Sequence, residues 1–441
     1  MLPFIPLQRL APFIAWSSVL VLASAAETAA PNLTLEQALA SVDKVNVSVL
    51  IGRENAAQAV QAIGQQRAGV MPVLDASVQQ RRSQGVSIAT VVVASGRPAS
   101  RFDALLSGSY AILNPQRLSA LKSVRTAAEV ARENFSAVVQ TVLADVASTY
   151  FTHLRNLRRL DVLDANIVRA RALLDLATNQ LKAGVATQID VTRAEAQLAI
   201  TEQARLQQVT AVFQSELFLK RLLDLDLGRE LTLENFQVRR ANSELFVFSE
   251  QQSTFDKRAD YLAAQRALEQ VRIDVRTASF ERLPSLLVTG NYGLASAKFD
   301  DSGKQDQWSL GLGLSVPVFD GLRTSANRRI ALSRQRVQET RLHSLELQIS
   351  AELRLALHSV SSRNAQIAVA EKSLRLAQEE LRLARQRYQQ GVADNREVVE
   401  AQNRLALADD NLVEAVYQYN LSRVELARAK GEVRTVLAEK K

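Results

Sequence analysis

The sequence predicts a mainly α-helical protein with a small membrane β part, built from two copies of a unit that contains a helix, a β-hairpin and a long helix. Three observations support this fold class. The 441 residues include only 16 Gly and 9 Pro, and Ala, Leu, Gln, Arg and Glu dominate, which favours long helices. Two segments around residues 184 and 391 nearly repeat each other, and a strictly alternating segment precedes the second long helical stretch.

The N-terminal residues have the pattern of an export signal. Arg9 precedes an apolar run that ends in the small residues "ASA" at 23–25, the pattern that signal peptidase cleaves after. We predict a signal peptide over residues 1–25, cleaved near Ala25 or Ala26. The alternative is a single membrane anchor, although the run is interrupted by proline and is shorter than the roughly 20 residues that a span needs.

Composition excludes several other classes of protein. The chain has no cysteine, so it has no disulfide framework, no thiolate metal site and no cysteine for a lipid anchor. An exported chain without cysteine suits a bacterial envelope. The formal charge is +8, but basic residues alternate with acidic ones along amphipathic stretches, which indicates solvated helix surfaces and no nucleic acid partner.

The repeat extends far upstream of the two similar turns. Residues 207 positions apart match without a gap, and apolar residues within each copy are spaced 3, 4, 3, 4, which is the seam of a coiled coil. We therefore interpret the chain as an internal duplication. The seam residues are Ile167, Ala170, Leu174, Ala177 and Leu181 in the first copy, and Leu374, Ala377, Leu381, Ala384 and Tyr388 in the second.

Both long helical stretches have more apolar surface than one seam needs. Leu376 and Leu383 form a further row in the second copy, and Leu176 matches Leu383 in the first. A helix with two apolar rows contacts neighbours on both sides, as in a wall of helices. Almost nothing interrupts the pattern over about 116–182 and 322–390, so each helix reaches roughly 100 Å at 1.5 Å per residue.

Each long helix ends in a tight turn, predicted at about 184–187 and about 391–394. Gly184 and Gly391 close the helices, since glycine adopts the left-handed conformation at low cost. A return helix follows each turn and begins at a capping-box pattern. These patterns are T-x-x-D from Thr187 to Asp190 and D-x-x-E from Asp394 to Glu397.

The second copy contains two predicted membrane strands, at about 285–296 and about 307–318. An apolar face that alternates with small or polar residues over about ten positions is typical of such strands. The polar segment "AKFDDSGKQD" between them fits an external loop. The apolar faces consist of Leu286, Val288, Tyr292 and Leu294 in one strand, and Trp308, Leu310, Leu312, Leu314, Val316 and Val318 in the other.

The first copy has a weaker pair of strands, predicted at about 72–82 and about 102–113. Four strands cannot close a barrel, and an open edge in lipid leaves backbone groups unpaired, so at least two chains must contribute. The alternative is a pair of hairpins packed on a soluble core. One face of the later strand carries Phe102, Ala104, Leu106, Gly108, Tyr110 and Ile112.

These elements divide the chain into a first repeat over residues 26–228, a linker or equatorial segment over residues 229–256, and a second repeat over residues 257–441. The heptad pattern stops in the linker. We expect a short helix or strand there, lying against the barrel wall.

Five stretches follow one another along the chain: "LTLEQALA" at 33–40, "YFTHLRN" at 150–156, the first turn "AGVATQIDV", "VPVFDG" at 316–321, and the second turn "QGVADNREVVEAQ". In this order they resemble the TolC-type outer membrane factors, the outer membrane efflux protein family. The resemblance covers nearly all of the chain after the signal peptide. It implies a homotrimer in the outer membrane, with a 12-strand β-barrel continuous with a 12-helix α-barrel that crosses the periplasm.

The resemblance also assigns roles to the two turns. Gly184 and Val185, with their partners Gly391 and Val392, match the tips at which a periplasmic adaptor, also called a membrane fusion protein, docks. The turn occurs twice because each chain presents two hairpin ends to the adaptor.

Glu397 and Glu400 match the positions that line the closed periplasmic gate in the family. Three chains would form two carboxylate rings that favour cations. This sequence has Glu where Asp is common. Glu397 has a second interpretation as a capping residue, and Glu400 corresponds to Arg193 in the first copy, so only the second turn provides such a ring.

Nothing in the sequence predicts an enzyme, a catalytic residue, a cofactor or a metal site, because the three histidines have no ligand-spaced partners. The expected function is a passive exit duct of a tripartite efflux or type I secretion system. An adaptor opens it, and an inner-membrane pump supplies the energy. The alternative is a soluble periplasmic coiled-coil adaptor or scaffold, but an adaptor would have no use for the lipid-like face of residues 308–318.

Overall fold

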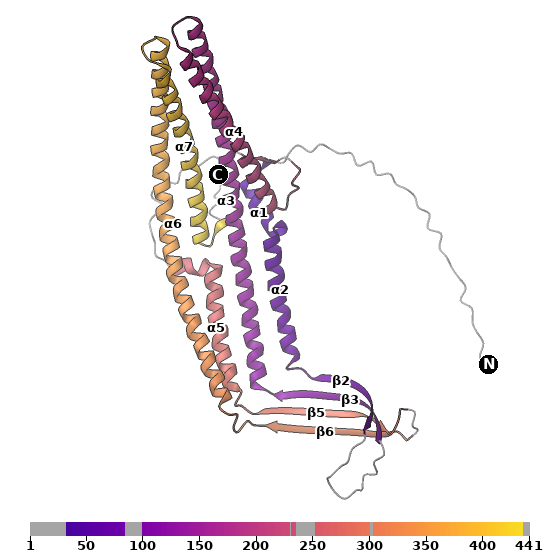
Figure 1. Cartoon of the computed structure of the whole chain (residues 1–441). Helices are drawn as coiled ribbons and strands as arrows, with labels where there is room; N and C mark the ends of the chain where they lie inside the picture. Colours follow the sequence, from indigo (N-terminus) through magenta and orange to yellow (C-terminus); the bar gives the residue numbers. More distant parts are fainter. Residues whose placement is uncertain (1–31, 84–98, 230, 235–251, 300–302, 435–441) are drawn as a thin grey trace, which may run out of the picture.

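The computed structural model describes residues 32–83, 99–229, 231–234, 252–299 and 303–434. The predicted signal peptide lies outside the described residues, as does most of the predicted linker. The described chain is elongated, with a sheet at one end and two long helical hairpins that extend away from it (Figure 1). The first copy contains β1 (Asn32–Leu33), α1 (Leu35–Val45), α2 (Val47–Ala68), β2 (Val73–Ser83), β3 (Ala99–Leu113), α3 (Pro115–Lys182) and α4 (Gln188–Leu222).

The second copy repeats this order of elements with nearly the same lengths. Helices α2 and α5 have 22 residues each, α3 and α6 have 68 and 67, and α4 and α7 have 35 each. Among the described residues, helix α1 has no equal in the second copy, where a short 3-10 helix, η2, precedes α5. The second group contains β4 (Thr232–Leu233), η2 (Gln252–Lys257), α5 (Ala259–Phe280), β5 (Ser285–Ser296), β6 (Gln305–Ser315), α6 (Arg323–Gln389) and α7 (Asn395–Ala429).

Each copy has an equivalent contact at the end of its return helix. The Asn46 side chain, at the start of α2, donates from Nδ2 to the carbonyl of Leu222, the last residue of α4, at 2.8 Å. The Arg258 side chain, at the start of α5, donates to the carbonyl of Ala429, the last residue of α7, at 3.5 Å. A buried side chain therefore satisfies a carbonyl at the open end of each return helix.

The chemistry of this contact differs between the copies. Asn46 also caps α2, because its Oδ1 accepts from the backbone of Ser48 at 2.9 Å and of Val49 at 3.2 Å. Arg258 instead forms ion pairs with Asp260 at 2.6 Å and with Glu352 of α6 at 2.8 Å. The first junction is neutral and the second is ionic.

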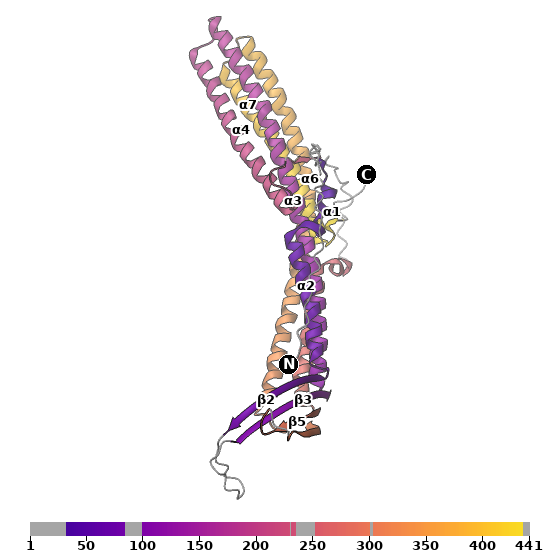
Figure 2. The ribbon, with the colours of Figure 1, turned by 90° about the vertical axis from the view of Figure 1, so that its right-hand side faces the viewer.

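The helices form two successive layers along the length of the molecule, one near the sheet and one farther from it. Near the sheet, α2 packs on α3, α3 on α5, and α5 on α6. Farther away, α4 packs on α3, α3 on α7, and α7 on α6, so α3 and α6 run through both layers (Figure 2). The main apolar cluster lies where the layers meet and contains Leu143, Tyr150 and Leu219.

The N-terminal strand and part of the linker are tied to this cluster. Strands β1 and β4 pair in parallel, Asn32 with Thr232 and Leu33 with Leu233. The Tyr150 hydroxyl lies 3.1 Å from the Leu33 carbonyl and 3.0 Å from the Glu234 carbonyl. The expected short strand in the linker is thus present as β4, packed on α3.

Most of the predicted seam is buried, including Ile167, Ala177, Leu381 and Tyr388, and in the first copy Leu173 is more deeply buried than Leu174. The further row of Leu376 and Leu383 is exposed in the single chain. If this row on α6 packs against a neighbouring helix, as predicted, that helix must come from outside this chain.

One antiparallel sheet contains all four long strands, in the order β2-β3-β5-β6. Its register places Leu106 opposite Tyr292, and Tyr292 opposite Trp308, so the predicted apolar faces of the strands coincide. Within the described residues, β2 and β6 each have one edge without a partner strand. The opposite face of the sheet carries small and polar residues, which include Asp75, Ser77, Asp103, Ser107, Thr289, Asn291, Ser309 and Gly311.

The strand ends differ from the expected ones by up to three residues. Strand β3 begins at Ala99, earlier than expected, and β6 ends at Ser315, before the expected end at 318. Pro317 has no backbone N–H to donate to the ladder, which explains the early end of β6. Val316 and Val318 therefore lie in the turn that leads to α6.

Candidate functional site

The two hairpin tips have the same backbone geometry. In the first, the Gly184 N–H donates to the Leu181 carbonyl and the Val185 N–H to the Gln180 carbonyl, both at 3.0 Å. The pair of bonds is a Schellman motif, in which the glycine takes a positive φ, here 75°. The second tip repeats these bonds 207 residues later, with Gly391 at φ 71°.

The turn leaves one apolar side chain uncovered at each tip. Val185 and Val392 are both exposed, although each follows a glycine that closes a buried seam. An exposed valine at the end of a long hairpin can contact a partner without rearrangement of the hairpin. The structure places the four predicted docking residues in two matching pairs, one at each tip.

The return helices begin at different caps. The backbone N–H and hydroxyl of Thr187 both donate to the Asp190 carboxylate, at 3.0 and 2.7 Å. In the second copy Asp394 accepts from the Glu397 N–H at 3.3 Å, but the Glu397 carboxylate lies 3.4 Å from Arg387. Glu397 thus supplies its N–H to the cap while its side chain pairs with the preceding helix.

Glu400 lies one turn farther along α7, between two arginines. Its carboxylate is 3.2 Å from Arg396 and 4.0 Å from Arg404. Arg404 also pairs with Glu380 of α6. Each predicted gate carboxylate therefore has a guanidinium beside it, so a ring of these residues would alternate in charge. Sequence reasoning missed the arginines, although the i, i+4 spacing of Arg396, Glu400 and Arg404 is a signal for such pairs.

The tips of the two hairpins are tied to each other by polar contacts. The side chain of Asn395, fully buried, donates to the Asp190 carbonyl at 2.8 Å, and Gln180 donates to the Tyr388 carbonyl at 3.4 Å. Burial, with the negative charge of Asp190, raises the pKa of Tyr388. The Tyr388 hydroxyl and Asn395 Oδ1 have no hydrogen-bond partner in the described chain. The contact between the tips therefore combines an apolar cluster, which includes Val191 and Val398, with polar groups that are incompletely satisfied.

Ion pairs continue this link along α3 and α7. Arg169 pairs with Asp409 at 3.2 Å, Arg159 with Asp410 at 2.6 Å and Arg155 with Glu414 at 3.4 Å. All six side chains are partly exposed, so each pair contributes little to stability. The three pairs join α3 of the first hairpin to α7 of the second.

The described residues offer no sign of a reaction centre. No three His, Asp or Glu side chains among them cluster as metal ligands. His153 is buried, with Nδ1 2.8 Å from the Ser215 hydroxyl, and burial lowers its pKa. His343 and His358 are exposed on α6. No helix in the described chain has the length and hydropathy of a membrane span.

Residues 32–224 and 251–432 match the family model of the outer membrane efflux protein. The chain belongs to this family. Both copies of the unit are matched, and most of the gap between the two matched ranges, residues 225–250, lies in the predicted linker. Members of the outer membrane efflux protein family are channels, which agrees with a site made of helix tips and a sheet with one apolar face.

Individual relatives and solved structures of the family support this assignment. Outer membrane protein OprJ of Pseudomonas aeruginosa is 26% identical over 71% of this chain and 65% of its own length, slightly under two thirds. Pyoverdine export outer membrane protein OpmQ of Pseudomonas aeruginosa is 25% identical over 90% of this chain and 83% of its own. The solved outer-membrane channel OprN, 19% identical, superposes with a TM-score of 0.81 over 90% of this chain and 89% of its own. The fold is that of an outer-membrane channel subunit.

Proposed function

We propose that three copies of this chain form an exit duct in the outer membrane, with a 12-strand barrel continuous with a 12-helix barrel. The observation that carries the proposal is the single sheet with one apolar face and two open edges, β2 and β6. An open edge in lipid leaves backbone groups unpaired at several kcal/mol each. Pairing β6 of one chain with β2 of the next satisfies both edges.

The helical layer supports the same closure. Helices α2 and α6 are the outer members of the layer near the sheet, as β2 and β6 are of the sheet. The exposed row of Leu376 and Leu383 then contacts the next chain. One rotation about a common axis would close the strand layer and the helix layer together.

The hairpin tips lie at the end of the chain opposite the sheet (Figure 1), so in this proposal they lie in the periplasm. There we assign Gly184, Val185, Gly391 and Val392 to the docking of a periplasmic adaptor that links the duct to an inner-membrane pump. The exposed valines and the shared turn geometry support this assignment. Relatives named for pyoverdine export and for solvent efflux support a role in export.

Glu397 and Glu400 form the periplasmic gate in this proposal. Their pairing with Arg387, Arg396 and Arg404 makes the gate a ring of alternating charge. In this proposal adaptor docking separates the tips and breaks the hydrogen bonds of Asn395 to the Asp190 carbonyl and of Gln180 to the Tyr388 carbonyl. Transport through the open duct is passive.

The first test is fractionation of the expressed protein, followed by electrophoresis with and without boiling. A heat-dissociated trimer in the outer-membrane fraction is the expected result. A monomer in the soluble periplasmic fraction would contradict the proposal, because the apolar face of the sheet would then need another cover. That result would favour the alternative of a periplasmic scaffold.

A further inference from the structure

Four chain segments connect the helices to the strands at one level of the molecule (Figure 1). Each segment, with the helix and strand ends beside it, carries exposed arginine and at least one exposed large apolar side chain. We call these residues the collar. The arginines are Arg67, Arg117, Arg282, Arg323, Arg328 and Arg329. The apolar residues are Met71, Leu113, Leu283, Val318, Phe319 and Leu322.

The turn between β6 and α6 is the most exposed part of the collar. Val318 is 95% exposed and Phe319 is 82% exposed. They lie within the "VPVFDG" motif, directly beside the apolar face of the sheet. Large apolar side chains this exposed indicate contact with a partner or a membrane. Because β6 leads straight into this turn, the apolar surface of the sheet continues onto the collar.

The arginines of the collar form no close ion pair in the described chain, although hydrogen bonds from Thr324, together with the nearby charge of Arg282, lower the pKa of Asp320. None of the six lies within 4.0 Å of a carboxylate oxygen in the part of the chain that the structure describes. Arg117 donates to the Gly69 carbonyl and Arg282 to the Ser325 hydroxyl, both neutral acceptors. The nearby carboxylates of Asp320 and Glu281 accept from Thr324 and Asn327, which are neutral donors. The collar therefore presents net positive charge.

Helix geometry directs this charge toward the sheet. Side chains on a helix lean toward its N-terminus, and both α3 and α6 begin at the collar. Arg117, Arg323 and Arg328 therefore lean toward the strands. The helix dipoles add little to this charge, because the negative ends of α2 and α5 lie at the same level as the positive ends of α3 and α6.

We propose that the collar binds the anionic headgroups of phospholipids in the periplasmic leaflet of the outer membrane. This inference rests on the proposed function, because the collar lies at the periplasmic membrane surface only if the sheet spans the membrane. The apolar residues enter the boundary of the acyl chains and the arginines bind the phosphates. Arginine suits this role because its planar fork of donors matches phosphate oxygens. The collar fixes the depth of the duct in the bilayer.

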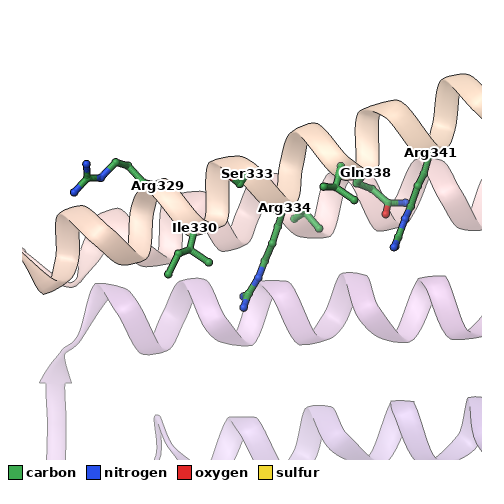
Figure 3. A pocket seen from close by; sticks show the side chains of 8 residues that line it. Arg329, Ile330, Ser333, Arg334, Gln338 and Arg341 are labelled. Atoms are coloured by element: carbon green, nitrogen blue, oxygen red, sulfur yellow. The ribbon is translucent and has the colours of Figure 1, made fainter.

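A matched pair of variants on α6 tests the proposal. Arg323→Gln with Arg328→Gln removes two charges of the collar. Arg334→Gln with Arg341→Gln removes two charges farther along the same helix, beside a groove of about 620 Å³ between α5 and α6 (Figure 3). None of the four arginines has an ion pair in the described chain, so both variants change the net charge equally without breaking a pair.

The measurement is the temperature at which the purified full-length trimer dissociates, with phosphatidylglycerol, phosphatidylcholine or inorganic phosphate added to the micelles. Phosphatidylglycerol should raise this temperature by several degrees for the wild type and the Arg334/Arg341 variant, and clearly less for the Arg323/Arg328 variant. High salt should abolish the difference. Phosphatidylcholine and inorganic phosphate should have little effect on any of the three proteins.

An equal response of both variants would overturn the proposal, as would an equal effect of phosphatidylcholine. A response to inorganic phosphate alone would indicate a simple anion site and would also overturn it. If the exposed apolar residues instead contact a neighbouring chain, Phe319→Ser lowers the dissociation temperature without any added lipid and leaves the response to phosphatidylglycerol intact. Failure of the proposed function itself has a different signature, since no heat-dissociable trimer would then be obtained.

Discussion

At the scale of single residues, Gly293 shows how closely the two copies approach each other in the sheet. A Cβ atom at this position would lie 2.0 Å from the Ala104 carbonyl oxygen on β3. No side chain can fit there without moving the backbone of β3 or β5. The pairing of β3 of the first copy with β5 of the second therefore requires glycine at position 293.

We therefore expect Gly293→Ala to reduce the amount of heat-dissociated trimer in the outer membrane severely. Gly313→Ala is the control, because its Cβ would have no neighbour closer than 3.9 Å. Fractionation followed by unheated electrophoresis measures the yield of both variants. Equal yields would mean that β3 and β5 separate at this point without cost.

Buried His153 gives a prediction for pH. Burial lowers its pKa, despite the nearby Glu216 charge that raises it, so the folded protein binds this proton less readily than the unfolded chain. Below pH about 6.5 the unfolded state takes up the proton first, and stability falls as the pH decreases. Above that pH both states are neutral and the residue contributes no pH dependence.

We expect His153→Gln to weaken the loss of thermal stability between pH 7.5 and pH 5.5 by a few degrees. Glutamine can keep a hydrogen bond to the Ser215 hydroxyl but cannot be protonated. His343→Gln, at an exposed position on α6, is the control and should behave as the wild type. If the curves of wild type and His153→Gln are parallel, another group controls the response to acid.

The residues of the tips could be predicted only in part from the sequence. The glycines at 184 and 391 were identifiable because a helix that ends in glycine has a known geometry, and both adopt a positive φ as expected. The partner of Asn395 was not predictable, since it lies 205 residues away and no local spacing indicates it. The roles of Glu397 and Glu400 at a gate remain a prediction.

At the scale of elements, β6 offers a direct probe of lipid contact. Trp308 lies on its apolar face and is exposed. The chain has two tryptophans, and the other, Trp16, lies in the predicted signal peptide. Removal of that peptide would leave Trp308 as the sole source of tryptophan fluorescence.

We expect phospholipids with brominated acyl chains to quench most of this fluorescence when the protein is reconstituted in vesicles. An aqueous quencher such as iodide should have a small effect. The reverse pattern would place β6 against water and remove the support for a transmembrane sheet. Ser309→Trp combined with Trp308→Phe moves the probe to the opposite face and should reverse the sensitivity.

The junctions of the return helices give a prediction about stability. Arg258→Gln leaves the carboxylates of Asp260 and Glu352 without their shared partner in a partly buried site. Breaking a fully buried pair costs about 3–5 kcal/mol, and partial exposure reduces this to roughly 2 kcal/mol. Asn46→Ala, at the first junction, removes a cap and should cost about 1 kcal/mol.

Limited proteolysis can measure both effects separately. Arg258→Gln should increase cleavage in α7 near its C-terminus, and Asn46→Ala should increase cleavage near the end of α4. If both variants expose the same hairpin, the two junctions are not independent. That result would contradict the division of the chain into two similar units.

Sequence patterns identified most elements because each carries its own period. Period two revealed the strands and their apolar faces, and the 3, 4 spacing revealed the long helices. The order β2-β3-β5-β6 was not predictable, because periodicity shows which face of a strand is buried but not which strand lies beside it. The end of β6 was placed too late because the alternation continues past Pro317, where the backbone can no longer pair.

At the scale of the whole molecule, the proposed gate gives a prediction about ion selectivity. We expect Glu400→Gln to shift the permeability of the open duct toward anions, and Arg404→Gln to shift it toward cations. Each of these exposed charges is worth about 0.2–1 kcal/mol, so the permeability ratio should change by up to roughly fivefold. Arg158→Gln, far from the tips on α3, is the control.

Reversal potentials in planar bilayers under a salt gradient measure these ratios. No change in either variant would mean that the narrowest part of the duct lies elsewhere. A shift in the same direction for both would indicate that the variants alter the width of the duct and not its charge. Opposite shifts would support the ring of alternating charge.

The unlike junctions at Asn46 and Arg258 have a consequence for symmetry. A ring of three duplicated chains contains six nearly equivalent hairpins, so its backbone approaches six-fold symmetry while its chemistry repeats only three times. Neutral and ionic junctions alternate around such a ring. The hairpins therefore fall into two classes with different resistance to bending, and a partner with six-fold symmetry would meet alternating strong and weak positions. Duplication within one gene makes this alternation possible, since six identical half-chains could not have it.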